Sequence, residues 1–233
     1  AQSPAGCAGG TATYNQCMCN KYKTPDQLEI ERSWHLDHHA PLKWPSEVFP
    51  RAPGPFLRAT NGQPPHLIIG TWGLIPDWSE TPKLKYATNN CRAEEAEGKP
   101  TFKLPWRHGQ RCIIPAASFD EPCWETGRNV WWRFSRADER PWGLAGLWNA
   151  WPDKKTGELV ESYTMLTVNA DAHPLMSRMH KPDPRLSQSQ QDKRSVVAIE
   201  REDFERWLQG TVEEVAGLIR PPGVELIEAG PVG

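Results

Sequence analysis

The chain has 233 residues, of which 38% are hydrophobic and 12 are tryptophans, and its formal net charge is -2. This length is typical of one domain, and the apolar residues suffice to fill a sizeable core. The near-neutral charge excludes a global basic field, so binding to nucleic acid would need a local patch. The sequence also lacks a run of about 18 apolar residues, which a transmembrane helix would require.

The N-terminal segment differs in composition from the rest of the chain. Its first 17 residues are small and polar, without the basic start and the apolar stretch of a secretory signal. We therefore expect a disordered or removable lead over residues 1–17 and one domain over residues 18–233. Without a secretory signal, we expect a cytoplasmic location, associated with the nucleoid if the source is bacterial.

Short apolar runs bounded by glycine and proline follow the lead, and their length and composition predict strands. These strands are expected at residues 66–75, 111–116, 130–135, 143–151, 163–168 and 195–200. Two helices are expected, from Pro25 to about Trp34 and from Glu202 to Leu208.

Residues 181–193 contain Pro, Ser, Gln and Asp in place of any apolar period, which predicts an exposed loop. Strands without a regular alternation of helices favour an α+β fold. We expect a single domain on a curved, mostly antiparallel, barrel-like sheet with a few peripheral helices.

The cysteines and histidines give no pattern of a metal site. The six cysteines are Cys7, Cys17, Cys19, Cys91, Cys112 and Cys123. They contain no C-x-x-C pair, and a chain of this length without a secretory signal predicts reduced thiols rather than a disulfide framework. The histidines at 35, 38 and 39 beside Asp37 have no second ligand group of matching spacing, which favours a polar surface loop. We expect neither a metal ion nor a cofactor.

The order of several short motifs is the most informative feature of the chain. Cys19 follows Met18, and the motifs after it are WGLIPDW at 72–78, NCRAE at 90–94, RCIIPA at 111–116, FDE at 119–121, AGLW at 145–148 and MH at 179–180. Together they resemble the SOS response-associated peptidase (SRAP) family. The resemblance runs from Met18 to about Leu208 and depends on the ordered set, because WGLIP alone would be a weak signal.

The resemblance implies a sensor of abasic sites in single-stranded DNA that forms a covalent DNA–protein crosslink through an N-terminal cysteine. By that match Cys19 is the nucleophile, and Asn90 and Glu121 are active-site residues. His180 is the remaining catalytic group. The expected partner is single-stranded DNA with abasic sites, and the protein is expected to act as a monomer away from membranes.

The chemistry of an abasic site explains these residue types. Its deoxyribose opens to an aldehyde, with which a neutral α-amine, of pKa about 7.7–8.0, forms a Schiff base. The thiol of Cys19 then closes a five-membered thiazolidine, helped by its place on the same residue. Glu121 and His180 suit the proton transfers as general acid and base, and Asn90 suits orientation of the amine or the sugar.

Candidate DNA contacts come from the same resemblance and from composition. Arg92 matches a position that contacts DNA phosphate, where arginine grips with two donors, and Pro50 matches a position near the DNA groove. Trp72 and Trp78 flank a turn with a proline, so an exposed indole there could stack on a base; the alternative is that both lie in the core. Lys21 stands where the family commonly has arginine, and it keeps the charge but loses the fork geometry.

Each assignment has an ordinary alternative. Asn90 could be a turn residue, and Glu121 before a proline could be a solvated loop carboxylate. His173 lies seven positions before His180, and the Arg-Met-Pro-like stretch that usually follows the family histidine is delayed to residues 193–197, with Ser195 where Met is usual. We favour His180 over His173.

The lead before Cys19 leaves more than one function open. Thiazolidine chemistry needs the free α-amine of Cys19. Translation starts at Met18, which we favour, or the lead is cut off after synthesis, or the lead stays and blocks this chemistry. A thiol autopeptidase that uses Cys19 to release its own N-terminal segment is one alternative function. A noncovalent module for binding single-stranded DNA is another.

Overall fold

A computed structural model describes residues 19–37, 40–59 and 62–232. The expected lead over residues 1–17, Met18 and the pair His38–His39 lie outside the described residues.

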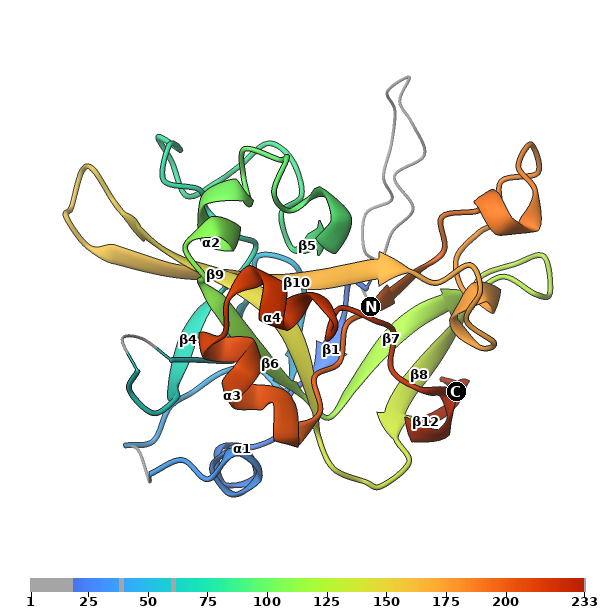
Figure 1. Ribbon diagram of the computed structural model, residues 1–233, viewed down its shortest axis with the longest axis horizontal. Coiled ribbons are helices and arrows are strands. Elements are labelled where there is room, and N and C mark those ends of the chain that lie inside the picture. The colour runs from blue at the N-terminus through green and yellow to red at the C-terminus, as the bar shows by residue number, and fades with distance from the viewer. Residues whose placement is uncertain (1–18, 38–39, 60–61, 233) are drawn as a thin grey trace, which may run out of the picture.

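Five strands close into a barrel, which Figure 1 shows at the centre of the molecule. They are β3 (Pro53–Arg58), β4 (His66–Trp72), β6 (Arg111–Ala116), β9 (Trp142–Pro152) and β10 (Leu159–Asn169). Around the barrel, β10 pairs with β4, β4 with β3, β3 with β6, β6 with β9, and β9 again with β10. Every pair in this circuit is antiparallel except β10 with β4, which is parallel. A closed circuit leaves no exposed edge among these strands.

The long strand β10 extends beyond the barrel and takes new partners there. On one edge it pairs in parallel with β5 (Asn90–Arg92), and on the other edge it pairs with β11 (Arg194–Val196). Two segments that are about 100 residues apart in sequence therefore flank the same end of one strand.

A second sheet lies against the barrel and is antiparallel throughout. Its strand order is β12 (Ile227–Pro231), β8 (Val130–Arg136), β7 (Ser118–Cys123), β1 (Tyr22–Lys23) and β2 (Glu47–Val48). In Figure 1, β7, β8 and β12 lie to the right of the barrel strands.

Alternating side chains of the barrel strands pack in two separate cores. On β6, Cys112 and Ile114 belong to a core shared with the second sheet, whereas Ile113 belongs to a core under the helices. Phe56 and Leu57 on β3 divide in the same way. This is the period-2 pattern of a strand that is buried on both faces.

Four α-helices cover the second core: α1 (Gln27–Trp34), α2 (Lys103–Arg107), α3 (Phe204–Gln209) and α4 (Val212–Ala216). Their starts follow local rules, since the Asp26 side chain accepts from the N–H of Glu29 at α1, and Thr211 and Glu214 form a capping box at α4. Short 3-10 helices lie at η1 (Ala93–Glu95), η2 (Met176–Arg178), η3 (Gln188–Gln190), η4 (Arg201–Asp203) and η5 (Val224–Leu226). No helix among the described residues is long and apolar enough to cross a membrane.

The expected α+β fold with a barrel-like sheet is confirmed, with differences in detail. The strand expected at 66–75 ends at Trp72, because Gly73 takes a φ of 154°, and the one expected at 195–200 covers only Arg194–Val196. The helix expected at 202–208 begins as η4 and continues as α3. The strands β3, β7 and β12, which contain prolines, and the short strands β1, β2 and β5 were not expected.

Candidate active site

Strand pairing brings Cys19 to Glu121. The strand β1 runs antiparallel to β7, and the pairing continues past β1, since the N–H of Asp120 donates to the carbonyl of Lys21 over 3.1 Å. Continuing this register by two residues from Tyr22 places Asn20 opposite Glu121, with Cys19 next to it. Glu121, for which a solvated loop carboxylate was the alternative, lies on the buried strand β7 and is 2% exposed.

Two asparagines, Asn89 and Asn90, bind the Cys19 segment. Asn90 Nδ2 donates to the carbonyl of Cys19 over 2.9 Å, and Asn89 Nδ2 donates to Asn20 Oδ1 over 3.3 Å. The carbonyl of Asn89 accepts bonds from the Trp72 indole and from the N–H of Met165, which fix the start of β5. The other atom of the Asn90 amide, the oxygen Oδ1, is buried and has no hydrogen-bond partner.

Glu121 and His180 form a buried pair. His180 Nε2 lies 3.0 Å from Glu121 Oε2, and the two side chains are 1% and 2% exposed. His180 adopts a left-handed backbone with φ of 62°, and its N–H donates to the carbonyl of Pro122 over 2.6 Å. The other ring nitrogen, Nδ1, is buried without a hydrogen-bond partner. An imidazole in this position can exchange a proton with Glu121 and still offer Nδ1 to a substrate.

The Cys19 thiol is held in its protonated form. Burial raises its pKa well above the ordinary value, and the negative charges of Glu121 and Asp120 raise it further. The thiol donates to the carbonyl of Lys21 over 3.6 Å, and the residue is 1% exposed. A proton acceptor is therefore needed before this sulfur can act as a nucleophile.

Asp120 anchors an ion network beside Cys19 that sequence reasoning missed. Its buried carboxylate accepts two bonds from Arg133, both 3.0 Å long, and lies 2.9 Å from Lys21 Nζ. Lys21 also lies 3.5 Å from Glu47. Lys21, expected to contact DNA, is thus the counter-ion of a buried carboxylate.

The stacking prediction for Trp72 is wrong. Trp72 is fully buried, its ring meets Tyr22 edge-on, and its indole N–H is bonded inside the core, so no face is left for a base. Trp78 differs, because it is 50% exposed and makes one long bond, 3.4 Å, to the carbonyl of Pro100. An indole with this exposure can meet a base.

The remaining candidate DNA contacts lie at the surface. Arg92 is half-exposed at the end of β5, with Nη2 2.6 Å from Asp192 and Nη1 3.8 Å from Glu95. Pro50 is partly buried in the turn that follows β2. Arg92 must therefore exchange an acidic partner for a phosphate if it is to contact DNA.

The structure separates the two candidate histidines. His173 Nε2 donates to the carbonyl of Pro222 over 2.9 Å, and its Nδ1 accepts from the N–H groups of Leu175 and Met176. These bonds occupy both ring nitrogens in holding the chain, whereas His180 faces Glu121.

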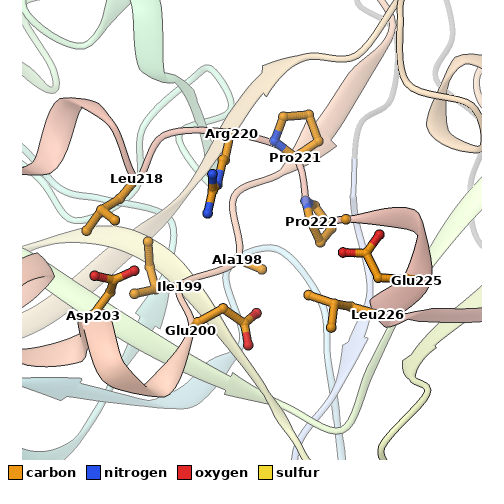
Figure 2. Close-up of a pocket in the computed structure, with 11 residues that line it drawn as sticks. Ala198, Ile199, Glu200, Asp203, Leu218, Arg220, Pro221, Pro222, Glu225 and Leu226 are labelled. Carbon is orange, nitrogen blue, oxygen red and sulfur yellow. The ribbon is translucent and has the colours of Figure 1, made fainter.

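One hollow of about 400 Å³ adjoins the site, lined by His180, Trp124, Arg178 and the segment around 182–193. Figure 2 shows a different hollow of about 270 Å³, surrounded by Glu200, Asp203, Glu225 and Arg220. The second hollow shares no lining residue with the site around Cys19. In the described part of the chain, no group of three or more His, Cys, Asp or Glu side chains is arranged to hold a metal ion.

The four predicted catalytic residues therefore come from four separate segments and meet at one place. Cys19 precedes β1, Asn90 begins β5, Glu121 lies on β7 and His180 follows η2. Asn89 and Asp120 support this arrangement, and both were missed. The doubled asparagine and the second acid before Pro122 were the sequence signals that could have indicated them.

Comparisons with known proteins agree with this arrangement. The profile of the family described as SOS response associated peptidase (SRAP) matches residues 18–233. Abasic site processing protein YoqW of Bacillus subtilis is 31% identical over 125 residues, covering 52% of this chain and 53% of that protein. Abasic site processing protein HMCES of Gallus gallus is 28% identical over 176 residues, covering 64% of this chain and 48% of that protein.

These curated relatives are longer than the part that aligns, since the matches span about half of their length. A crystal structure of a Bordetella bronchiseptica protein is similar over 92% of this chain and 100% of its own, with a TM-score of 0.81 and 33% identity.

Proposed function

Because the chain belongs to the SOS response-associated peptidase (SRAP) family, we propose that it captures abasic sites in single-stranded DNA as a covalent crosslink to Cys19. One observation carries the proposal: Cys19 lies beside the buried Glu121–His180 pair. As an N-terminal residue, a cysteine there would offer both an amine and a thiol to an aldehyde. The names of the relatives, abasic site processing proteins, support the same substrate class.

The reaction balances with the loss of one water. The α-amine of Cys19 adds to the aldehyde carbon of the opened sugar, and water leaves to give an imine. The thiol sulfur then bonds to the imine carbon while its proton passes to the nitrogen, which closes the thiazolidine. The second step is intramolecular and gains from the fixed distance between sulfur and nitrogen.

The surrounding side chains supply the proton transfers. Glu121 is placed to accept a proton from the thiol or the amine, and His180 to pass one to the departing sugar oxygen. Asn90 already holds the Cys19 carbonyl, and its unpaired Oδ1 is an acceptor for an N–H of the amine. These roles explain why polar atoms of the site are left without partners.

The crosslink requires that the peptide bond between Met18 and Cys19 be broken, because an amide nitrogen does not form an imine. Self-cleavage is the second candidate function, favoured by the position of the Cys19 thiol beside a proton acceptor. In that reaction the sulfur attacks the Met18 carbonyl, the C–N bond breaks, and the freed amine takes up the proton of the thiol. Water then hydrolyses the thioester and leaves Cys19 as the N-terminus.

The test is intact mass spectrometry of protein that begins at Cys19, before and after incubation with a single-stranded oligonucleotide carrying one abasic site. We expect a near-stoichiometric adduct equal to the sum of the two masses less one water. Cys19→Ala should give no thiazolidine adduct stable to heat. A stable adduct on Cys19→Ala, or no adduct on the wild type, would contradict the proposal. If the wild type binds the oligonucleotide but forms no adduct, the protein is a noncovalent DNA-binding module.

A separate sample tests self-cleavage. The chain with residues 1–18 attached should convert with time to a species that starts at Cys19, and Glu121→Gln should slow this conversion. A chain that keeps its full mass through purification and prolonged incubation would exclude self-cleavage.

A further inference from the structure

Lys193 is a buried lysine whose ammonium bonds the main chain of His180. The residue is 5% exposed, and its Nζ donates to the carbonyl of Met179 over 2.7 Å and to the carbonyl of His180 over 2.6 Å. No part of the proposed reaction uses this amine directly.

The main chain of Lys193 is itself fixed. Its N–H donates to Asp171 Oδ1 over 2.7 Å, and its carbonyl accepts from the N–H of Ala170 over 2.7 Å. Both partners follow directly on β10, so the base of the lysine side chain is tied to the barrel. The amine at its other end therefore reaches His180 from a rigid support.

His180 needs such support because its backbone is in an unfavourable region. A residue with a Cβ seldom adopts a φ near 62°, and the chain leaves the sheet immediately afterwards into residues 181–193. On one side the His180 N–H bonds to Pro122, the neighbour of Glu121. On the other side the carbonyls of Met179 and His180 have Lys193 as their partner.

An ammonium group is well suited to this position. It carries three donors and can bond two carbonyls at once, whereas an apolar side chain such as that of methionine would leave both oxygens unsatisfied. Burial lowers the pKa of Lys193, and the charges of Asp171 and Cys123 act to raise it. Asp183, His180 and Arg178 line the same hollow as the lysine.

We infer that Lys193 is a positioning residue for the crosslinking reaction: its ammonium fixes the left-handed backbone of His180, so that the imidazole faces Glu121. The inference rests on the proposed function for its catalytic consequence, but the position of the imidazole can be measured without DNA.

The chain offers a matched control for removal of this lysine. Arg111 is also a buried cation, 2% exposed, and donates to two main-chain carbonyls, those of Trp207 and Gly210. Arg111→Met and Lys193→Met each leave two main-chain carbonyls without their cationic donor. Only Lys193→Met does this to the carbonyl of His180.

Two measurements on protein beginning at Cys19 test the inference. We expect Lys193→Met to lower the single-turnover crosslinking rate at least tenfold and to shift the 15N resonances of the His180 ring measured without DNA. Noncovalent affinity for DNA with an unreactive tetrahydrofuran site should stay within twofold. Arg111→Met should lower the thermal midpoint but leave the rate of the folded protein and the His180 resonances as in wild type.

A second variant covers failure of Lys193→Met to fold. Lys193→Gln keeps amide donors but loses charge and length, and we expect an intermediate rate with shifted His180 resonances. Wild-type rates and resonances in whichever variant folds would overturn the inference. A wild type that never crosslinks would instead contradict the proposed function and leave the resonance comparison intact.

Discussion

The two faces of the barrel strands use buried polar groups differently. Under the helices, Arg111 donates to the carbonyl of Trp207, and the Trp207 indole donates to the carbonyl of Cys112, so each group ties one chain segment to another. Guanidinium and indole groups do not change protonation near neutral pH. Around Cys19 on the other face, the buried groups are a thiol, a carboxyl and an imidazole, all of which exchange protons.

Among the described residues, both faces have buried polar atoms without partners. Under the helices they are the indole nitrogen of Trp34 and one nitrogen of Arg111, whose guanidinium already makes two bonds to the chain. At the site they are Oδ1 of Asn90, which bonds the Cys19 carbonyl through its other end, and Nδ1 of His180, which faces Glu121 through its other nitrogen. An unsatisfied buried polar group costs about 1–3 kcal/mol, so both faces give up some stability. The two faces therefore differ in the chemical kind of their buried groups, and not in whether all their polar atoms are paired.

The largest effect on the reactive face is expected from Glu121→Gln. The crosslinking rate of protein beginning at Cys19 should fall about 10²–10⁴-fold, the range for loss of a general acid or base. The thiol itself should become more reactive, because the Glu121 charge raises the pKa of Cys19 and its removal lowers that pKa. Below the pKa, a lower pKa means more thiolate, so alkylation of Cys19 by iodoacetamide at fixed pH should be faster.

Single-turnover crosslinking and peptide mass spectrometry of the alkylated protein measure the two effects. Glu158→Gln, in the exposed turn between β9 and β10, makes the same charge change and should alter neither rate. Slower alkylation together with slower crosslinking would mean that Glu121 acts on the thiol mainly as a proton acceptor, and not through the charge that raises its pKa.

The helical face should respond in stability and not in chemistry. Trp207 is fully buried, so Trp207→Ala should lower the free energy of unfolding by about 3–5 kcal/mol. Its crosslinking rate per folded molecule should match the wild type, since the helical core lies on the opposite face from Cys19. Urea unfolding measures the first quantity and single-turnover crosslinking the second.

Trp131, which is 43% exposed, is the control. Trp131→Ala should change the free energy of unfolding by about 0.5 kcal/mol or less. If Trp207→Ala impaired crosslinking of the folded protein as strongly as Glu121→Gln, the two faces would not be independent.

The sequence predicted the parts of the fold that have a local signal. Apolar runs such as those of β6 and β10 were recognised because both faces of these strands are buried. The strand β7 was not, because Pro122 argues against a strand. It is tolerated because the last bond from β7 to the β1 segment comes from the N–H of Asp120, so the missing N–H of Pro122 costs no ladder bond there.

The site was predicted through the order of motifs, whereas its supporting contacts join distant segments. No local pattern links Lys193 to His180 or Asp120 to Arg133, because these contacts exist only after the sheets have formed. Trp72 shows the converse error. The sequence around a tryptophan beside a turn is the same whether its side chain faces solvent or the core. Only its packing against Tyr22 shows that Trp72 is buried.

The smallest effects are expected at the rim of the reactive face, at Arg92. If this guanidinium contacts a phosphate, Arg92→Gln should reduce the salt dependence of binding to single-stranded DNA by about 0.7 in the slope of log K against log salt. Arg92→Gln should also weaken the binding of DNA. Asp192→Asn should strengthen it, because it removes the carboxylate that lies 2.6 Å from Arg92. Asparagine is tolerated at the Asp192 φ of 53°, so this change need not disturb the backbone.

Titration of fluorescent single-stranded DNA with a tetrahydrofuran site, repeated over a range of salt, measures both variants without crosslinking. Tighter binding by Asp192→Asn with an unchanged slope for Arg92→Gln would mean that removal of a negative charge, and not release of Arg92, governs affinity. Opposite shifts would place a phosphate at Arg92 and extend the reactive face from Cys19 along β5, since Asn90 and Arg92 are the two ends of that strand.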